Sequence, residues 1–242
     1  MTTLATTRAT GRASIGADAR DVGGLLLIGA AAGALAGAVV GGIGGRLAML
    51  VLRLASDPFV NGMMSDDGFE IGRVTLGGTI QLAGGTAALG AANGALYVVL
   101  RGSIPARLRV PLWSLFGAAV GGMAFVHADG VDFTVLEPLW FAVLAFVALP
   151  GIAALAVVLL VERWLGGAGG RPHTAALVAA AALGTVALAL VAALGIAVLA
   201  VRRLGLSGRL GAVGRVVVPP ALVIASIAAA WVAFEQASLI LG

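Results

Sequence analysis

The chain has 242 residues, of which 60% are hydrophobic and 11% charged, and its formal net charge is +4. Soluble domains carry about 25% charged and about 45–50% apolar residues, so these values exclude a water-soluble enzyme and a disordered chain and leave an integral membrane protein. All 15 basic residues are Arg and lie scattered between apolar runs, whereas a surface that binds nucleic-acid phosphates gathers its cations on one face. We therefore expect the lipid bilayer as a partner, and no nucleic acid.

Long, continuously apolar segments predict an all-α fold, a polytopic bundle of transmembrane helices. A helix needs about 20 apolar residues to cross the hydrocarbon core, and the strands of a membrane barrel would be shorter and would alternate in polarity. The six predicted spans would form a single transmembrane domain over residues 23–242, after a flexible tail over 1–22. These spans are 23–45, 74–100, 111–128, 138–161, 174–201 and 217–240.

The first span admits two interpretations. The apolar run from Leu25 and the sequence Ala34-Leu35-Ala36, with its two small residues, resemble a cleavable secretory signal, but the apolar character continues for a full span, which favours an uncleaved helix. No helix breaker occurs before Ser56-Asp57-Pro58. The helix can therefore extend over 23–55, or about 50 Å at 1.5 Å per residue, and its end would protrude or lie along the interface.

The charges of the loops give conflicting indications about orientation. Cytoplasmic loops carry an Arg excess, yet six spans with an internal N-terminus place eight Arg inside and seven outside. Loop 2 (101–110) holds Arg and no acid, and loop 3 (129–137) holds acids and no Arg, which favours a cytoplasmic N-terminus. Loop 5 (202–216) holds four Arg and disagrees. Either loop 5 lies outside and pairs with acids there, or one segment is re-entrant and the count is five; we favour six.

Aromatic and proline residues fit the predicted map. Trp140 and Trp164 bracket the fourth span at a separation that suits the two interfacial belts, and Trp113 begins the third. Pro219 and Pro220 suit the first turn of the sixth helix, where a missing N–H has little effect. A composition rich in Ala, Gly, Val and Arg without Lys is typical of a GC-rich genome, and it favours a bacterial inner membrane.

The most regular local pattern is a glycine in every fourth position of the first span. Such a stripe of small residues lets a second helix approach closely, and shorter repeats occur in the second and third spans. We expect these faces to pack helices within the bundle. A homo-oligomer or a membrane-protein partner on the same faces, or a helix that slides during transport, is the alternative. The residues are Gly29, Gly33, Gly37, Gly41 and Gly45, then Gly90 and Gly94, and Gly117 and Gly121.

Polar residues inside apolar spans are costly and are often functional. Thr hydroxyls can bond to carbonyls of their own helix, and buried amides need partners, so interhelical hydrogen bonding is favoured over the lining of a polar pathway. The carboxylate near the C-terminus is expected close to the far interface. The candidates for a pathway are Thr79, Gln81, Thr86, Asn93 and Glu235.

Arg46 and Arg53 are seven residues apart and share one face of the extended first helix. Arg at this depth is expected to bind lipid phosphate at the interface. Recognition of an anionic substrate is the alternative interpretation.

One cluster in the sequence combines a His with carboxylates. Such groups can bind a divalent cation or transfer protons, but their spacing matches no metal signature, so a solvated acidic loop is favoured. The chain has no Cys, and no metal or cofactor is expected. The catalytic candidates are His127, Asp129, Asp132, Glu137, Asp66, Asp67 and Glu70.

Three function classes follow from these patterns. The favoured class is a small transporter, a permeation protein or a subunit of a transport complex, which requires the polar face of the second helix and Glu235 to share a cavity. The second is a non-catalytic assembly subunit, which requires an exposed Gly29–Gly45 face. The third is an intramembrane lipid-modifying enzyme, which requires His127 and the acids of loop 1 within hydrogen-bonding reach.

Overall fold

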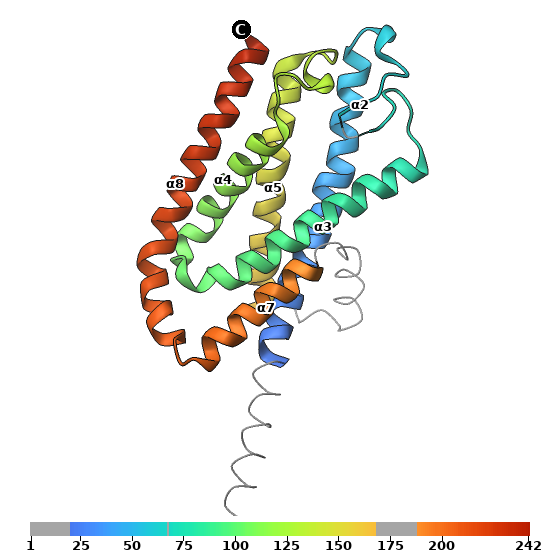
Figure 1. Ribbon diagram of the computed structural model, residues 1–242. Helices are drawn as coiled ribbons and strands as arrows, with labels where there is room; N and C mark the ends of the chain where they lie inside the picture. The colour runs from blue at the N-terminus through green and yellow to red at the C-terminus, as the bar shows by residue number, and fades with distance from the viewer. Residues whose placement is uncertain (1–19, 67, 168–187) are drawn as a thin grey trace, which may run out of the picture.

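The computed structural model describes residues 20–66, 68–167 and 188–242 (Figure 1). All regular structure in these ranges is helical, apart from one isolated β-bridge between Met64 and Glu70. Five of the described helices are long and apolar enough to cross a membrane. The predicted all-α class is confirmed, and the five candidate spans indicate a multi-pass membrane location. The spans are Arg20–Ala55, Leu76–Ser103, Ala106–Phe125, Leu139–Leu165 and Leu210–Leu241.

The first long helix runs without interruption from Arg20 to Ala55, as the absence of breakers predicts. Its middle is a π-helix, η1 (Gly37–Gly44), and its last part is α2 (Gly45–Ala55). Loop 1 (residues 56–75) contains the 3-10 helix η2 (Pro58–Val60). The elements that follow are α3 (Leu76–Leu100), η3 (Arg101–Ser103), α4 (Ala106–Phe125), η4 (Val131–Phe133), α5 (Leu139–Leu165), α7 (Leu188–Arg203) and α8 (Ser207–Leu241).

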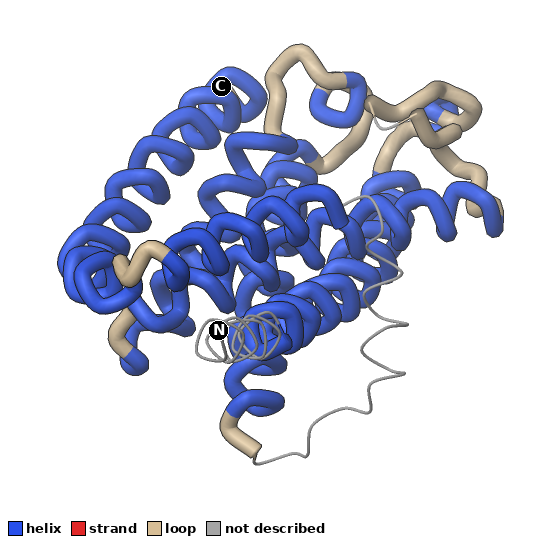
Figure 2. Tube along the Cα trace, turned by 60° about the horizontal axis from the view of Figure 1, so that its bottom comes forward, coloured by secondary structure: helices blue, strands red, loops and turns tan. Residues whose placement is uncertain are grey.

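The long helices alternate in direction, so their connections gather at two ends of the bundle. Figure 1 shows loop 1, loop 3 (residues 126–138) and the C-terminus at one end, and the α3–α4 and α7–α8 connections at the other. The longer loops, tan in Figure 2, lie together. Gly214 in α8 lies against Ser103 in η3, which places the start of α8 beside loop 2. We call these the loop 1 end and the loop 2 end.

The segment predicted as the fifth span, 174–201, falls partly outside the described residues. Its described part belongs to α7, which has 16 residues and packs through Leu194 and Val198 against Val22 and Leu26 of the first long helix. Among the described residues, five helices are candidate spans. Figure 1 shows that α5 ends and α8 begins at the loop 2 end, so loop 5 lies at the same end as loop 2.

Most of the tail predicted over 1–22 lies outside the described part of the chain, which begins at Arg20. Its last three residues, 20–22, are already helical, and Val22 is buried against α7. Ala34, at the predicted cleavage site of a signal peptide, is fully buried in the bundle.

Two further positions differ from prediction. Pro219 and Pro220 lie well inside α8, not in its first turn, because α8 begins at Ser207. Trp113 lies within α4 and is fully buried instead of lying at an interface. Its ring packs against that of Tyr97, with the ring centroids 5.2 Å apart. Trp113 therefore belongs to the core between α3, α4 and α5.

A close crossing joins the first long helix to α3. A side chain on Gly33 would collide with the carbonyl oxygen of Gly90, and a side chain on Gly90 would collide with that of Gly33. Gly29 and Gly94 form a second reciprocal pair of this kind. The two backbones touch with no side chain between them, so dispersion and Cα–H···O contacts act along the crossing. The glycine face of the first helix is thus covered by α3.

The contact loosens only toward the end of the repeat. A side chain on Gly37 would collide with the backbone carbonyl of Thr86 and one on Gly41 with the Thr86 side chain, whereas a side chain on Gly45 would make only an ordinary contact with Leu82 at 3.6 Å. A four-residue repeat advances by about 40° per step in an α-helix of 3.6 residues per turn, so an α-helical stripe of five glycines would turn away from α3. The wider turns of η1 counteract this drift.

A second glycine contact joins α4 to α5. A side chain on Gly117 would collide with Ala154, and one on Gly121 would collide with the ring of Pro150. Pro150 lies inside α5, so its ring occupies the space that the α4 glycines leave. The three glycine repeats therefore all lie at helix–helix contacts inside the described bundle.

Gly33→Ala should lower the free energy of unfolding by about 1–3 kcal/mol, because the added methyl group overpacks a backbone contact. The measurement is the thermal unfolding midpoint of the purified chain in detergent. Gly85→Ala is the matched control in α3, since a methyl group there meets nothing within 4 Å and gains up to about 1 kcal/mol of helix propensity. Equal midpoints for the two variants would contradict the close crossing.

Candidate functional site

The polar residues predicted to line a pathway do not meet in the described structure. The hydroxyls of Thr79 and Thr86 donate to carbonyls of their own helix, at 2.9 and 2.8 Å. Asn93 accepts a hydrogen bond of 2.8 Å from the indole N–H of Trp113, which is an interhelical bond in the core. Gln81 and Glu235 are exposed on the outer surface of the bundle. Their positions support packing rather than a shared cavity.

The carboxylates of the His127 cluster connect loops 1 and 3. His127, Asp129 and Glu137 are exposed, and Asp132 is buried. Asp66 joins loop 1 to loop 3, because its two carboxylate oxygens accept hydrogen bonds from the backbone N–H groups of residues 131 and 132, at 2.9 and 3.1 Å. No group of three or more His, Asp or Glu that could hold a metal ion occurs among the described residues. Asp67 lies outside the described residues.

Two further contacts hold loop 1 in place. The backbone N–H of Glu137 in loop 3 donates to the hydroxyl of Ser56 at 2.7 Å, at the point where α2 ends. Thr75 caps the start of α3, since its hydroxyl accepts from the N–H of Gly78 at 3.1 Å. Loop 1 is therefore fixed at both ends and packed against loop 3.

A cavity of about 330 Å³ lies between α2, loop 1 and loop 3. Arg46 and Arg53 point into it from one face of α2, two helical turns apart, as their spacing in the sequence predicts. The lining is part cationic and part apolar, with two carboxylates. The lining residues are Arg46, Met49, Leu50, Arg53, Ser65, Phe69, Glu70, Ile71, Gly72, Arg73, Val74, Asp132 and Leu136.

Arg46 holds a guanidinium group with two unused hydrogen-bond donors. Its Cζ lies 4.8 Å from the centre of the Phe69 ring, a cation–π distance. Its Nε and Nη2 atoms are buried and have no hydrogen-bond partner. Gly78 leaves room for this group, because a side chain there would displace Nη2. An unpartnered buried cation is costly, and it marks a candidate site for an anion.

Arg53 is held in position by Asn61, near the start of loop 1. Its Nε donates to Oδ1 of Asn61 at 3.1 Å. Gly72 has a φ of +86°, a conformation that favours glycine, and a side chain there would collide with Asn61. Arg73 differs from the other two, because it forms an exposed ion pair with Glu70 at 3.1 Å. Neither Arg46 nor Arg53 takes part in the ion pairs of the described residues.

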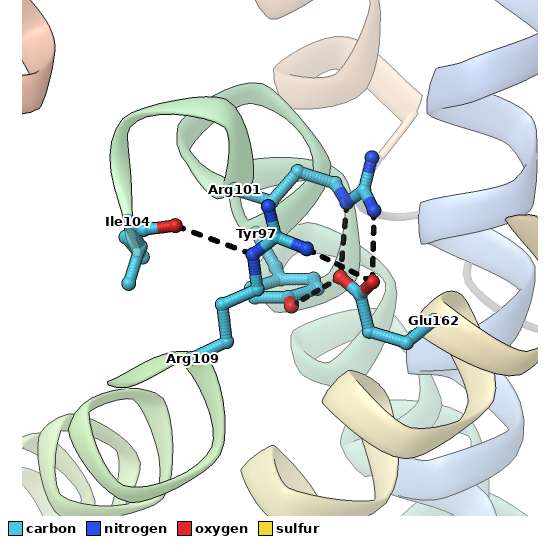
Figure 3. A network of polar contacts seen from close by, with 5 residues as sticks. All are labelled: Tyr97, Arg101, Ile104, Arg109 and Glu162. Atoms are coloured by element: carbon cyan, nitrogen blue, oxygen red, sulfur yellow. Dashed lines mark hydrogen bonds and ion pairs between the residues drawn. The ribbon is translucent and has the colours of Figure 1, made fainter. Parts of the chain in front are cut away.

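Figure 3 shows a second polar cluster, at the loop 2 end. The carboxylate of Glu162 accepts from Nε and Nη2 of Arg101, at 3.0 and 2.8 Å, from Nη1 of Arg109 at 3.0 Å and from the hydroxyl of Tyr97 at 2.7 Å. Arg109 also donates to the carbonyl of Ile104 at 3.3 Å. The cluster ties α3, α4 and α5 together, and all its charged groups have partners. We assign it a structural role.

Several residues of these two sites escape sequence reasoning. Phe69 and Asn61 lie in loop 1, whose path over α2 has no periodic signal. Glu162 directly follows the predicted span 138–161. An acid at the end of a span, in a chain whose loops are rich in Arg, indicates an ion pair. Tyr97 is the single tyrosine of the chain, and a lone hydroxyl within an apolar span also indicates a buried partner.

The chain matches no protein-family model, no curated protein and no solved structure. The functional interpretation therefore depends on the residues and contacts of this chain alone. Of the two polar clusters, the one around Glu162 is closed and satisfied, whereas the pocket of Arg46 and Arg53 contains a cavity and unused hydrogen-bond donors. The pocket is the better candidate for a binding site.

Glu162→Gln should lower the free energy of unfolding by about 1–3 kcal/mol, because two guanidinium groups lose a shared, partly exposed carboxylate. Thermal unfolding in detergent measures the change. Glu70→Gln is the matched control, since its ion pair with Arg73 is exposed and should contribute less than about 1 kcal/mol. If both variants unfold at the same temperature, the Glu162 cluster does not stabilise the bundle.

Proposed function

We propose that this multi-pass membrane protein binds a phosphate-bearing anion in the pocket of Arg46 and Arg53, at the end of the bundle that faces away from the cytoplasm. The observation that carries the proposal is the pair of buried, unpartnered donors on Arg46 beside a cavity that a second Arg also lines. Two guanidinium groups on one helix face provide a forked set of donors for the oxygens of a phosphate group.

The pair of Arg101 and Glu162 in this chain shows how one guanidinium group binds two oxygens of an anion. Arg101 uses its Nε and Nη2 atoms to bind both oxygens of Glu162. Arg46 leaves the same two atoms without a partner. The Cζ of Arg46 lies over the Phe69 ring, and Arg46 lines the cavity. A phosphate group in the cavity would supply oxygens that accept charge-assisted hydrogen bonds from these two atoms.

The distribution of charge supports a cytoplasmic N-terminus. By backbone position, the described residues of the loop 2 end include nine Arg and two acids, which are Arg20, Arg101, Arg107, Arg109, Arg163, Arg202, Arg203, Arg209, Arg215, Asp21 and Glu162. Those of the loop 1 end include three Arg and seven acids, which are Arg46, Arg53, Arg73, Asp57, Asp66, Glu70, Asp129, Asp132, Glu137 and Glu235. Cytoplasmic loops carry the Arg excess, so five spans remove the conflict that six spans create. A bacterial inner membrane fits the Arg-only composition.

The other function classes gain less support from the described residues. Transport through the bundle would need a cavity shared by Gln81 and Glu235, and both are exposed on its outer surface. Assembly through the glycine face of the first helix would need that face to be open, and α3 lies against it. Catalysis by His127 would need its imidazole among the loop 1 acids, and the carboxylate of Asp66 instead binds backbone N–H groups.

Single Cys residues introduced at Asp129 in loop 3 and at Leu204 in loop 5 should be labelled from opposite sides of the membrane. The chain has no native Cys, so a membrane-impermeant maleimide reports each site without background. Asp129→Cys should react in intact cells, and Leu204→Cys should react only after the membrane is opened. Labelling of both from the same side would contradict five spans, and the reversed pattern would contradict the orientation.

Binding of the anion is tested with lysophosphatidic acid and with the matching monoacylglycerol, which lacks the phosphate. The full chain in phosphatidylcholine nanodiscs should bind the phosphate-bearing probe more tightly. Arg46→Gln and Arg53→Gln should each weaken that binding by about 10-fold or more, since a charge-assisted hydrogen bond contributes about 1.5–3 kcal/mol. Arg107→Gln, which removes an exposed charge at the loop 2 end, is the matched control. Equal binding by all three variants would overturn the proposal.

A further inference from the structure

We infer that the anion is the headgroup of a lipid that enters the pocket sideways from the bilayer, with its hydrocarbon chain along the exposed apolar face of the first long helix. The inference rests on the proposed anion site and adds the class of the ligand. A lipid headgroup and free phosphate present the same oxygens to Arg46 and Arg53, so the remaining features of the pocket must distinguish them.

The first such feature is the chemistry of the lining. A free, hydrated anion would be bound best by polar groups on all sides, because partial burial among apolar groups removes water without replacing it. Nearly half of this lining is apolar. The apolar members come from α2, loop 1 and loop 3. They are Met49, Leu50, Phe69, Ile71, Val74 and Leu136. A headgroup attached to a hydrocarbon chain satisfies both parts of such a lining.

The second feature is an opening toward the outer surface of the helix. Leu50 lines the cavity and is also 44% exposed. Large apolar side chains continue from this point along the first long helix toward the middle of the bundle. They are Leu47, Ile43, Val39 and Leu35, and all are exposed. The cavity is therefore continuous with an apolar strip, which we define as these four residues.

The position of the strip follows from the glycine repeat. Each strip residue lies two positions after a repeat glycine, as Leu35 does after Gly33, and two residues of an α-helix turn about 200°. The strip therefore faces away from α3, which covers the glycines. From Leu35 to Leu47 it spans about 18 Å at 1.5 Å per residue, close to half of the roughly 30 Å hydrocarbon core. A lipid chain of one leaflet can follow this length while its phosphate stays at the level of Arg46.

The test compares three probes with the full chain in phosphatidylcholine nanodiscs: lysophosphatidic acid, glycerol 3-phosphate and inorganic phosphate. The Arg46→Gln/Arg53→Gln variant measures the background, which includes partition into the lipid. We expect Arg-dependent binding of lysophosphatidic acid to be about 100-fold tighter than that of glycerol 3-phosphate, since each buried methylene adds several-fold in affinity. Inorganic phosphate should bind no more tightly than glycerol 3-phosphate.

A substitution in the strip tests the route of the chain. Leu47→Gln should weaken the binding of lysophosphatidic acid by about 5-fold or more, while glycerol 3-phosphate binding and the unfolding midpoint stay unchanged. Leu159→Gln in α5 is the matched control, because Leu159 is exposed to a similar extent but lies on another helix, outside the strip.

The outcomes separate the two proposals. If glycerol 3-phosphate binds as tightly as the lysolipid, and both depend on Arg46 and Arg53, the anion site stands and the lipid inference is wrong. Equal effects of Leu47→Gln and Leu159→Gln contradict the route along the strip. If no probe shows Arg-dependent binding, the anion site itself is wrong.

Discussion

The contact between the backbones of the first long helix and α3 fixes the rest of the loop 1 end. With Gly33 against Gly90 and Gly29 against Gly94, the helices approach so closely that no side chain can intervene, and their crossing has one possible depth and rotation. The same two helices then carry Arg46 and Gly78 into contact at the loop 1 end. Loop 1 connects them and can close over α2 because both of its ends are already placed. The pocket is a consequence of helix packing.

Arg residues serve opposite purposes at the two ends of the bundle. At the loop 2 end, Arg101 and Arg109 share the carboxylate of Glu162, and the cluster joins three helices. At the loop 1 end acids are more numerous, yet Arg46 packs against an aromatic ring and keeps two donors unused. Nearby acids have other roles, since Asp66 binds backbone N–H groups. An acidic surface around a cationic pocket also disfavours the arrival of free anions from solution, which is a further reason to look to the bilayer for the ligand.

The sequence predicts features that depend on local composition, and it does not predict features that depend on how separate segments meet. Apolar length gives five of the spans, and the absence of a breaker gives the extension of the first helix to Ala55. Spacing alone puts Arg46 and Arg53 on one face. Apolar length could not reveal that α5 ends and α8 begins at the same end of the bundle, because this depends on how the helices pack. The bond between Asn93 and Trp113, like the place of Phe69 over Arg46, is set by helix register and loop path.

The π-helix η1 separates two faces of one helix that have different tasks. The glycines before it, with Gly37 and Gly41 inside it, pack against α3, whereas α2 after it brings Arg46 and Arg53 to the cavity. A π-helical turn is wide because it contains more residues than an α-helical turn. Loss of one residue within 37–44 would let this stretch rewind as an α-helix and leave both faces directed as they are. Loss of one residue in the α-helical part before it would rotate everything that follows by about 100°. The wide turns of η1 are thus the part of the first helix where the loss of one residue keeps both faces in place.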